Sequence, residues 1–85
     1  MPEYSIFLTK TAAKQLDKLP DEVAETLLET IQSLASDPRP PGYKKLKGRD
    51  GYRVRQGNYR ILYDIFDKML VVEVVALGHR KDIYQ

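Results

Sequence analysis

The stretch that decides the fold runs from residue 52 to residue 63 and reads Tyr52-Arg53-Val54-Arg55-Gln56-Gly57-Asn58-Tyr59-Arg60-Ile61-Leu62-Tyr63. Its β-branched and aromatic side chains predict two short strands. Gly57-Asn58 supplies a tight turn between them, since both residues tolerate positive φ. In that register Gln56 faces Tyr59. The stretch therefore predicts a β-hairpin.

Three arginines of this hairpin are expected on one face. Arg53 and Arg55 lie two positions apart and project to the same side of their strand. Across the turn, Arg55 faces Arg60 and Arg53 faces Leu62. Like charges directly opposite each other weaken a sheet. This arrangement does not favour folding but suits a polyanion, so the face is a candidate active surface.

Composition narrows the possible functions. The 85 residues, 42% of them hydrophobic, predict a single globular domain over residues 1–85. The chain has no Cys, which excludes disulfides, thiolate nucleophiles and cysteine zinc sites. With His79 as the single His, a His-based metal cluster and a Ser or Cys triad are also excluded.

Charge is distributed unevenly along the chain. Residues 1–38 hold three Lys/Arg against seven Asp/Glu, whereas residues 39–85 hold eleven against five. A basic half in a protein of net charge +2 indicates a charged partner at one face, most commonly a nucleic acid. A solvated basic surface is the alternative.

The sequence predicts no export or membrane segment. Residues 1–5 have no basic region leading into an apolar run. The apolar run Leu70–Leu77 contains Glu73 and is too short for a bilayer. We expect a soluble cytoplasmic protein.

The chain is expected to begin with a strand and a short helix. Residues 3–9 alternate apolar and polar side chains, which predicts a strand. Thr9 or Thr11 can cap the helix that follows, and the helix is expected to end near Leu19.

A second helix is expected between Asp21 and Pro38. Acidic residues in its first turn suit the helix dipole. Its apolar stripe has helical spacing and is interpreted as core. The stripe consists of Val23, Leu27, Ile31 and Leu34, with Ala24, Leu28 and Ala35 beside them.

A long basic loop over Asp37–Gly51 connects the helices to the hairpin. Its prolines forbid helix and its glycines mark turns, while Tyr43–Leu46 could pair briefly as a strand. The cations of the loop are Lys44, Lys45, Lys47 and Arg49. Strands over Tyr59–Phe66 and Met69–Leu77, joined at Asp67-Lys68, are expected to form a second hairpin.

The predicted fold class is α+β: an N-terminal strand, a helical hairpin and an antiparallel three-strand meander, with the helices packed on one face. The side chains expected on the helix-covered face are Ile61, Tyr63, Ile65, Leu70, Val72 and Val74. The other face is basic at one end and partly apolar, which is typical of a partner site. Its members are Arg53, Arg55, Arg60, Leu62, Asp64, Val71, Glu73 and Val75.

The residues permit a limited chemistry. Asp64 and Glu73 are too few for a catalytic metal, and no glycine-rich loop opens a helix to hold phosphate. Arginines bind phosphate through a planar fork and could either bind RNA passively or stabilise a pentacoordinate phosphate. Tyr84 could stack on a base, and His79 could titrate near neutral pH.

The order of elements, the loop Leu46-Lys47-Gly48, the Arg hairpin and the tail Gly78-His79-Arg80 resemble the RelE family of bacterial toxins. The pattern Asn-Tyr-Arg, two apolar residues and Tyr is shared with the wider RelE/ParE superfamily. Basic residues at 53, 55, 60 and 80, with a tyrosine near the C-terminus, resemble the RNA-cleaving branch.

The resemblance implies a metal-independent endoribonuclease, an mRNA interferase that acts on mRNA in the ribosomal A site and leaves a 2′,3′-cyclic phosphate and a 5′-hydroxyl. Arg53 and Arg55 match the basic residues near the 2′-OH and phosphate, and Arg60 matches the arginine that stabilises the phosphate. Arg80 matches the group near the leaving 5′-oxygen, and Tyr84 the tyrosine that stacks on the nucleotide. Lys44, Lys45, Lys47 and Arg49 would bind RNA in the ribosome.

The chain departs from the family at positions 53 and 55, where other members often have lysine. Arginine does not readily exchange a proton, so charge stabilisation is the role expected there. We hypothesise that His79 or Tyr84 takes part in proton transfer; the alternative for His79 is a strand-end residue beside the site.

The resemblance also implies partners: a cognate RelB-like antitoxin, the ribosome and mRNA, with no membrane and no small-molecule cofactor. Two alternatives remain open. One is a ParE-like toxin that inhibits gyrase, and the other is an RNA-binding homologue that does not cleave.

Overall fold

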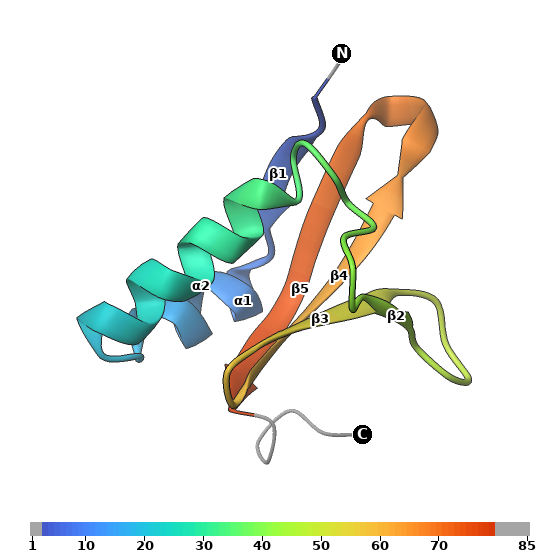
Figure 1. Ribbon diagram of the computed structural model, residues 1–85. Coiled ribbons are helices and arrows are strands. Elements are labelled where there is room, and N and C mark those ends of the chain that lie inside the picture. Colours follow the sequence, from blue (N-terminus) through green and yellow to red (C-terminus); the bar gives the residue numbers. More distant parts are fainter. Residues whose placement is uncertain (1–2, 80–85) are drawn as a thin grey trace.

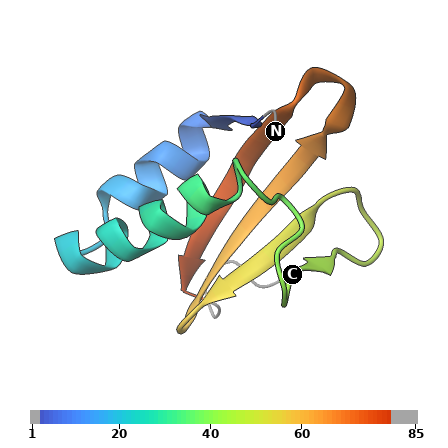
Figure 2. The ribbon, with the colours of Figure 1, turned by 45° about the horizontal axis from the view of Figure 1, so that its top comes forward.

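The computed structural model describes residues 3–79, which form two α-helices, a short 3-10 helix and five strands (Figure 1). The elements in chain order are β1 (Ser5–Leu8), α1 (Lys10–Asp17), α2 (Asp21–Ser33), β2 (Lys44–Lys45), β3 (Tyr52–Gln56), β4 (Tyr59–Phe66), η1 (Asp67–Met69) and β5 (Val71–His79). The strands lie in the order β1-β5-β4-β3-β2. Both helices lie on one face of the sheet (Figures 1 and 2). We call the opposite face the outer face. The α+β class is confirmed.

The helices begin where their capping residues predict. Thr9 precedes α1, and its hydroxyl oxygen accepts a hydrogen bond from the backbone N–H of Ala12 at 3.1 Å. The same hydroxyl donates to the carbonyl of Val75 at 3.0 Å, which ties the start of α1 to β5. α2 begins directly after Pro20 with Asp21 and Glu22 in its first turn. Of the two caps considered, Thr9 is the one used.

The core lies between the helices and the sheet. Leu27, Ile31 and Leu34 of the predicted α2 stripe are buried. They pack with the inward side chains of three strands, namely Val54, Ile61, Tyr63, Val72, Val74 and Leu77. Burying a side chain of this size contributes about 1.5–3 kcal/mol, so this layer fixes the sheet on which the site is built. Tyr59 packs against the same layer.

The register of the β3–β4 hairpin is as predicted. Gln56 pairs with Tyr59, Arg55 with Arg60, and Arg53 with Leu62. Gly57 in the turn has φ 62, a conformation that glycine adopts without steric cost. The alternation then sends Val54 to the core, and so Arg53 and Arg55 to the outer face.

The predicted connection between β4 and β5 is wrong. Phe66 pairs with Val71, not with Met69, because η1 and Leu70 form a longer turn. Leu70 closes it with φ 54 and donates from its N–H to the carbonyl of Asp67 at 3.2 Å. Leu70 therefore does not join the inward face. The observed pairing beyond Tyr63 is shifted by two residues from the predicted one, so the same side chains face inward. A bulge between Leu62 and Tyr63 changes the register of the remaining pairs.

The predicted meander is β3-β4-β5, and two further strands extend it. β1 pairs in parallel with β5, from Ser5 opposite Val71 to Leu8 opposite Val74. β2 pairs with β3 and confirms the short strand expected within Tyr43–Leu46. The result is a mixed sheet in which β2 brings the basic loop beside the arginines.

Candidate active site

Four cationic side chains share the outer face where β2, β3 and β4 run side by side. Lys44 pairs with Arg53 across β2 and β3, and Arg55 pairs with Arg60 across β3 and β4. Directly paired residues project to the same face, with Cβ atoms about 4.5–5.5 Å apart. Arg53 and Arg55 are linked by their two-residue spacing on β3. We call these four residues the cation cluster.

The two lysines of β2 lie on opposite faces. The ring of Tyr43 contacts that of Tyr52, with centroids 5.9 Å apart, and Lys45 also pairs with Tyr52. Tyr43 and Lys45 thus flank Lys44 and lie on the face of Tyr52. Because neighbouring residues of a strand alternate, Lys44 projects the other way, towards Arg53.

The close spacing of the cation cluster affects the pKa of Arg53. Partial burial lowers the pKa of Arg53 first, and the positive charges of Arg55 and Arg60 lower it further. A guanidinium remains protonated despite such a shift, so three fixed charges stay close together. The arrangement stabilises a bound anion more than it stabilises the sheet.

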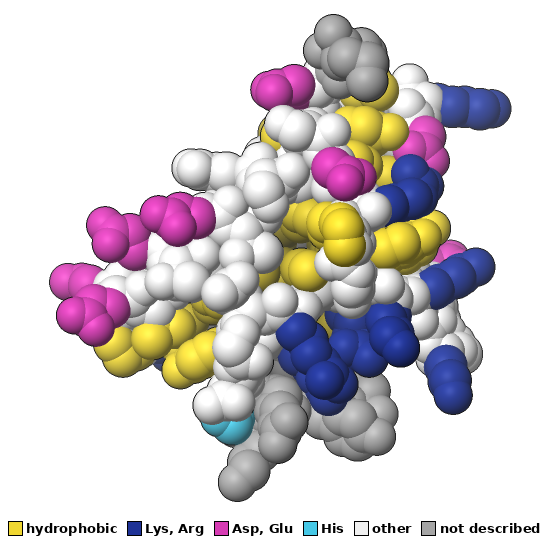
Figure 3. Space-filling view, in the orientation of Figure 1, with side chains coloured by type: hydrophobic (Ala, Val, Ile, Leu, Met, Phe, Trp, Pro, Cys, Tyr) yellow, Lys and Arg dark blue, Asp and Glu magenta, His cyan; other side chains and the backbone are white. Residues whose placement is uncertain are grey.

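The surface charges are segregated (Figure 3). In this view most lysine and arginine side chains gather over β2, β3 and their loops, whereas a group of aspartate and glutamate side chains lies at the far end of the helices and others lie towards the top of the molecule (Figure 3). The charge asymmetry along the chain is therefore also an asymmetry in space. It directs a polyanion to the end of the molecule that carries the cation cluster.

The remaining cations of the basic loop, Lys47 and Arg49, are exposed in the turn between β2 and β3. The turn closes when the N–H of Leu46 donates to the carbonyl of Gly51 at 3.0 Å. Gly51 is buried with φ 122, and a Cβ there would lie 3.1 Å from Cδ1 of Leu46 and 3.2 Å from Oδ1 of Asp64. Only glycine fits, and it fixes the turn that presents both cations.

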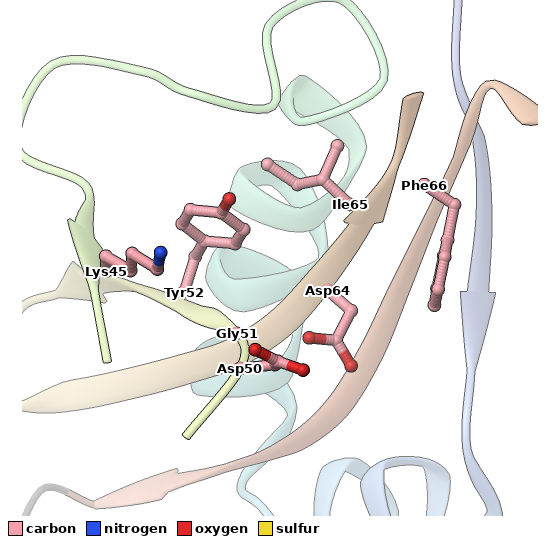
Figure 4. Close-up of a pocket in the computed structure, with 7 residues that line it drawn as sticks. All are labelled: Lys45, Asp50, Gly51, Tyr52, Asp64, Ile65 and Phe66. Atoms are coloured by element: carbon pink, nitrogen blue, oxygen red, sulfur yellow. The ribbon is translucent and has the colours of Figure 1, made fainter. Parts of the chain in front are cut away.

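A pocket of about 270 Å³ lies beside this turn (Figure 4). The carboxylates of Asp50 and Asp64 lie near Gly51, with Lys45 and Tyr52 on another side (Figure 4). Two carboxylates repel phosphate, whereas the cation cluster attracts it. Of these two places, the cation cluster is the one whose charge suits a phosphate.

Loop 37–43 is held against the sheet by two polar anchors that the sequence did not indicate. Arg39 donates to both carboxylate oxygens of Asp67 at 3.3 and 2.9 Å, and Tyr4 donates to the same carboxylate at 2.6 Å. Arg39, then Tyr4, holds the pKa of Asp67 below its usual range. The buried hydroxyl of Tyr63 donates to the carbonyl of Pro38 at 2.7 Å, and burial raises its pKa to about 12.

The structure does not bring His79 to the cation cluster. The register pairs His79 with Tyr59, and their rings meet edge to face with centroids 5.6 Å apart. Tyr59 and His79 each lie two positions from a buried core residue, Ile61 and Leu77, so this pair lies on the helix side of the sheet. Arg53, Arg55 and Arg60 are brought together as predicted. The predicted residues Arg80 and Tyr84 lie outside the described residues.

Neither a metal-ligand cluster nor a membrane-spanning helix occurs within residues 3–79. No group of three or more His, Cys, Asp or Glu side chains there could hold a metal ion. Neither α-helix in this range has the length and apolar character needed to cross a membrane.

Comparison with known proteins identifies the family. The model of the ParE toxin of type II toxin–antitoxin systems, parDE, matches residues 6–84. The chain belongs to the RelE/ParE family of toxins. It is a RelE-like toxin of the type II class, as the Arg hairpin and the order of elements predicted.

Named RelE toxins are similar to this toxin over nearly its full length. Toxin RelG of Mycobacterium tuberculosis is 32% identical over 84 residues, which cover 96% of this chain and 97% of RelG. The mRNA interferase toxin RelE of Escherichia coli K12 is 31% identical over 81 residues, covering 92% and 84%. The toxin–antitoxin complex RelBE2 of M. tuberculosis contains a chain that matches with a TM-score of 0.81 at 31% identity, covering 94% and 100%.

The cation cluster contains one residue whose position the sequence did not predict. The family resemblance groups Lys44 with Lys45 as contacts to ribosomal RNA, yet only Lys44 faces Arg53. Neighbouring residues of a strand face opposite sides of the sheet, so the two lysines can be assigned to different faces once the partner strand is known. The signal was present, but a two-residue strand is too short to show its register.

Proposed function

We propose that this toxin is a metal-independent, ribosome-dependent endoribonuclease that cleaves mRNA in the A site. The observation that carries the proposal is the convergence of Arg53, Arg55 and Arg60 on one face. A relative of similar length carries the name mRNA interferase, which supports this choice of activity. An array of fixed cations suits a reaction whose nucleophile belongs to the RNA itself, because the cations stabilise the charge that develops on the phosphate.

The proposed reaction is an internal transesterification. The 2′-oxygen attacks the adjacent phosphorus, the O2′–P bond forms, and the P–O5′ bond breaks. The 2′-oxygen loses a proton and the 5′-oxygen gains one, which leaves a 2′,3′-cyclic phosphate and a 5′-hydroxyl. The enzyme has to align these atoms, neutralise the pentacoordinate phosphate and move the protons.

The cation cluster supplies the first two contributions. Arg53 and Arg55 hold the phosphate beside the attacking 2′-oxygen, and Arg60 neutralises charge that develops on the phosphate oxygens. By resemblance, Arg80 lies near the leaving 5′-oxygen and Tyr84 stacks on the nucleotide. We assign Lys45, Lys47 and Arg49 to ribosomal RNA, because exposed cations near a polyanion add affinity.

We also propose that a RelB-like antitoxin silences the toxin. The RelBE2 chain and an archaeal RelE from Pyrococcus horikoshii were both solved in complexes with their antitoxins. The outer face also offers apolar side chains at the η1 end of β4 and β5, among them Phe7, Phe66 and Met69, which suits a protein chain laid across the sheet. Covering the cations would exclude mRNA.

Purified protein added to translating ribosomes tests the proposal. Primer extension should map cuts within the A-site codon, with the predicted cyclic phosphate and 5′-hydroxyl ends. A combined Arg53→Ala, Arg55→Ala and Arg60→Ala variant should lose the cuts. A combined Lys10→Ala, Lys14→Ala and Lys18→Ala variant removes as many exposed charges from the α1 region and should cut like the parent.

The matching family model is that of ParE, so gyrase inhibition is the second candidate. A supercoiling assay with purified gyrase distinguishes the two. Intact mRNA on ribosomes together with arrested supercoiling would favour the ParE-like activity over the one proposed.

A further inference from the structure

The proposed reaction needs a group that takes a proton from the 2′-OH, and the arginines of the cation cluster are poor choices. A guanidinium stays protonated in proteins, whereas the amine of lysine can exchange its proton. Lys44 is the one lysine in the cation cluster. It is paired with Arg53, the residue assigned to the 2′-OH side of the phosphate.

Other titratable side chains of the described sheet are less suitable. His79 lies against Tyr59 on the helix side. Asp64 shares the outer face but packs over Gly51, where its Oδ1 would lie 3.2 Å from an added Cβ. Its negative charge also repels the phosphate that the reaction must bind. Lys44 is exposed, so its side chain is free to reach a bound nucleotide.

We propose that the Lys44 amine accepts the 2′-OH proton in the cleavage reaction, a role that rests on the proposed nuclease activity. As the O2′–P bond forms, the neutral amine takes the proton and becomes an ammonium ion. The P–O5′ bond breaks, and the 5′-oxygen receives a proton in turn, so the reaction consumes none overall. Lys44 then joins Arg53 as a catalytic residue and is no longer a contact to ribosomal RNA.

Single-turnover cleavage of mRNA on purified ribosomes tests this role with two variants. Lys44→Arg keeps the charge and removes the exchangeable amine, and Lys44→Ala removes both. Each should slow cleavage about 10²–10⁴-fold, the usual contribution of a positioned acid or base. Added methylamine should restore part of the Lys44→Ala rate in proportion to its free-base concentration.

Lys45→Ala is the matched control for the rescue. It removes the neighbouring amine, which projects to the opposite face, so its rate should not respond to methylamine whatever that rate is. Thermal unfolding of each variant verifies that the sheet is intact.

Three outcomes would overturn the proposal. A Lys44→Arg variant that cleaves within a few-fold of the parent shows that charge suffices. A Lys44→Ala variant that methylamine does not rescue shows that the proton is accepted elsewhere. If the parent leaves ribosomal mRNA intact, the proposed nuclease activity fails, and the role of Lys44 fails with it.

Discussion

Arg39 and Arg53 occupy opposite environments in the same small protein. Arg39 donates two hydrogen bonds to the carboxylate of Asp67, and this pairing raises the pKa of Arg39. Arg53 lies among like charges, and partial burial together with Arg55 and Arg60 lowers its pKa. Arg39 holds a loop in place, whereas Arg53 belongs to the cation cluster, the proposed RNA site. The two arginines therefore differ in the sign of the charges around them, which are opposite at Arg39 and like at Arg53.

The largest expected effect concerns the cation cluster. Arg60→Ala should reduce mRNA cleavage on ribosomes about 10²–10³-fold, because a donor that stabilises transition-state charge contributes this much. Single-turnover rates measure it, with Lys10→Ala on α1 as the control. A parental rate for Arg60→Ala would assign Arg60 a structural role like that of Arg39.

A smaller effect is expected on the binding of single-stranded RNA. Arg53→Ala should weaken binding by about 1.5–3 kcal/mol, the usual contribution of a charged hydrogen bond. The slope of log affinity against log salt should become shallower by about 0.7, the loss of one phosphate contact. Fluorescence anisotropy at several salt concentrations measures both, and an unchanged slope would remove Arg53 from the phosphate site.

The third prediction is that the cation cluster lowers folding stability. Arg55→Thr removes one of two like charges that face each other across β3 and β4. It should raise the free energy of unfolding by about 0.2–1 kcal/mol. Denaturant unfolding measures the change. A loss of stability would show that Arg55 makes favourable contacts within the fold.

The smallest expected effect is a pH dependence of folding stability that arises from the ion pair between Arg39 and Asp67. Arg39 and Tyr4 lower the pKa of Asp67 from its ordinary value of 3.8, so the pair stabilises the fold above that pH. This contribution should be lost as the pH falls below 3.8 through the pKa of the folded state. Thermal unfolding in acid should show a steeper decline for the parent than for Asp67→Asn. Parallel declines would contradict the role of the pair.

Local patterns predicted most of what positions the site. Helical spacing identified the α2 stripe, and Gly57-Asn58 set the β3–β4 register and with it the three arginines on one face. What the sequence could not give depends on pairing between distant segments. The parallel pairing of β1 and β5, the η1 turn and the facing of Lys44 all require a partner strand that no local pattern specifies. The Arg39–Asp67 anchor is likewise formed by residues 28 positions apart.

Mapping of mRNA ends on ribosomes, with the parent beside the combined Arg53→Ala, Arg55→Ala and Arg60→Ala variant, tests the central claim most directly. The claim is that these guanidinium groups act together on one phosphodiester. It predicts A-site cuts with 2′,3′-cyclic phosphate and 5′-hydroxyl ends for the parent and none for the variant. Equal cutting by both proteins would contradict it.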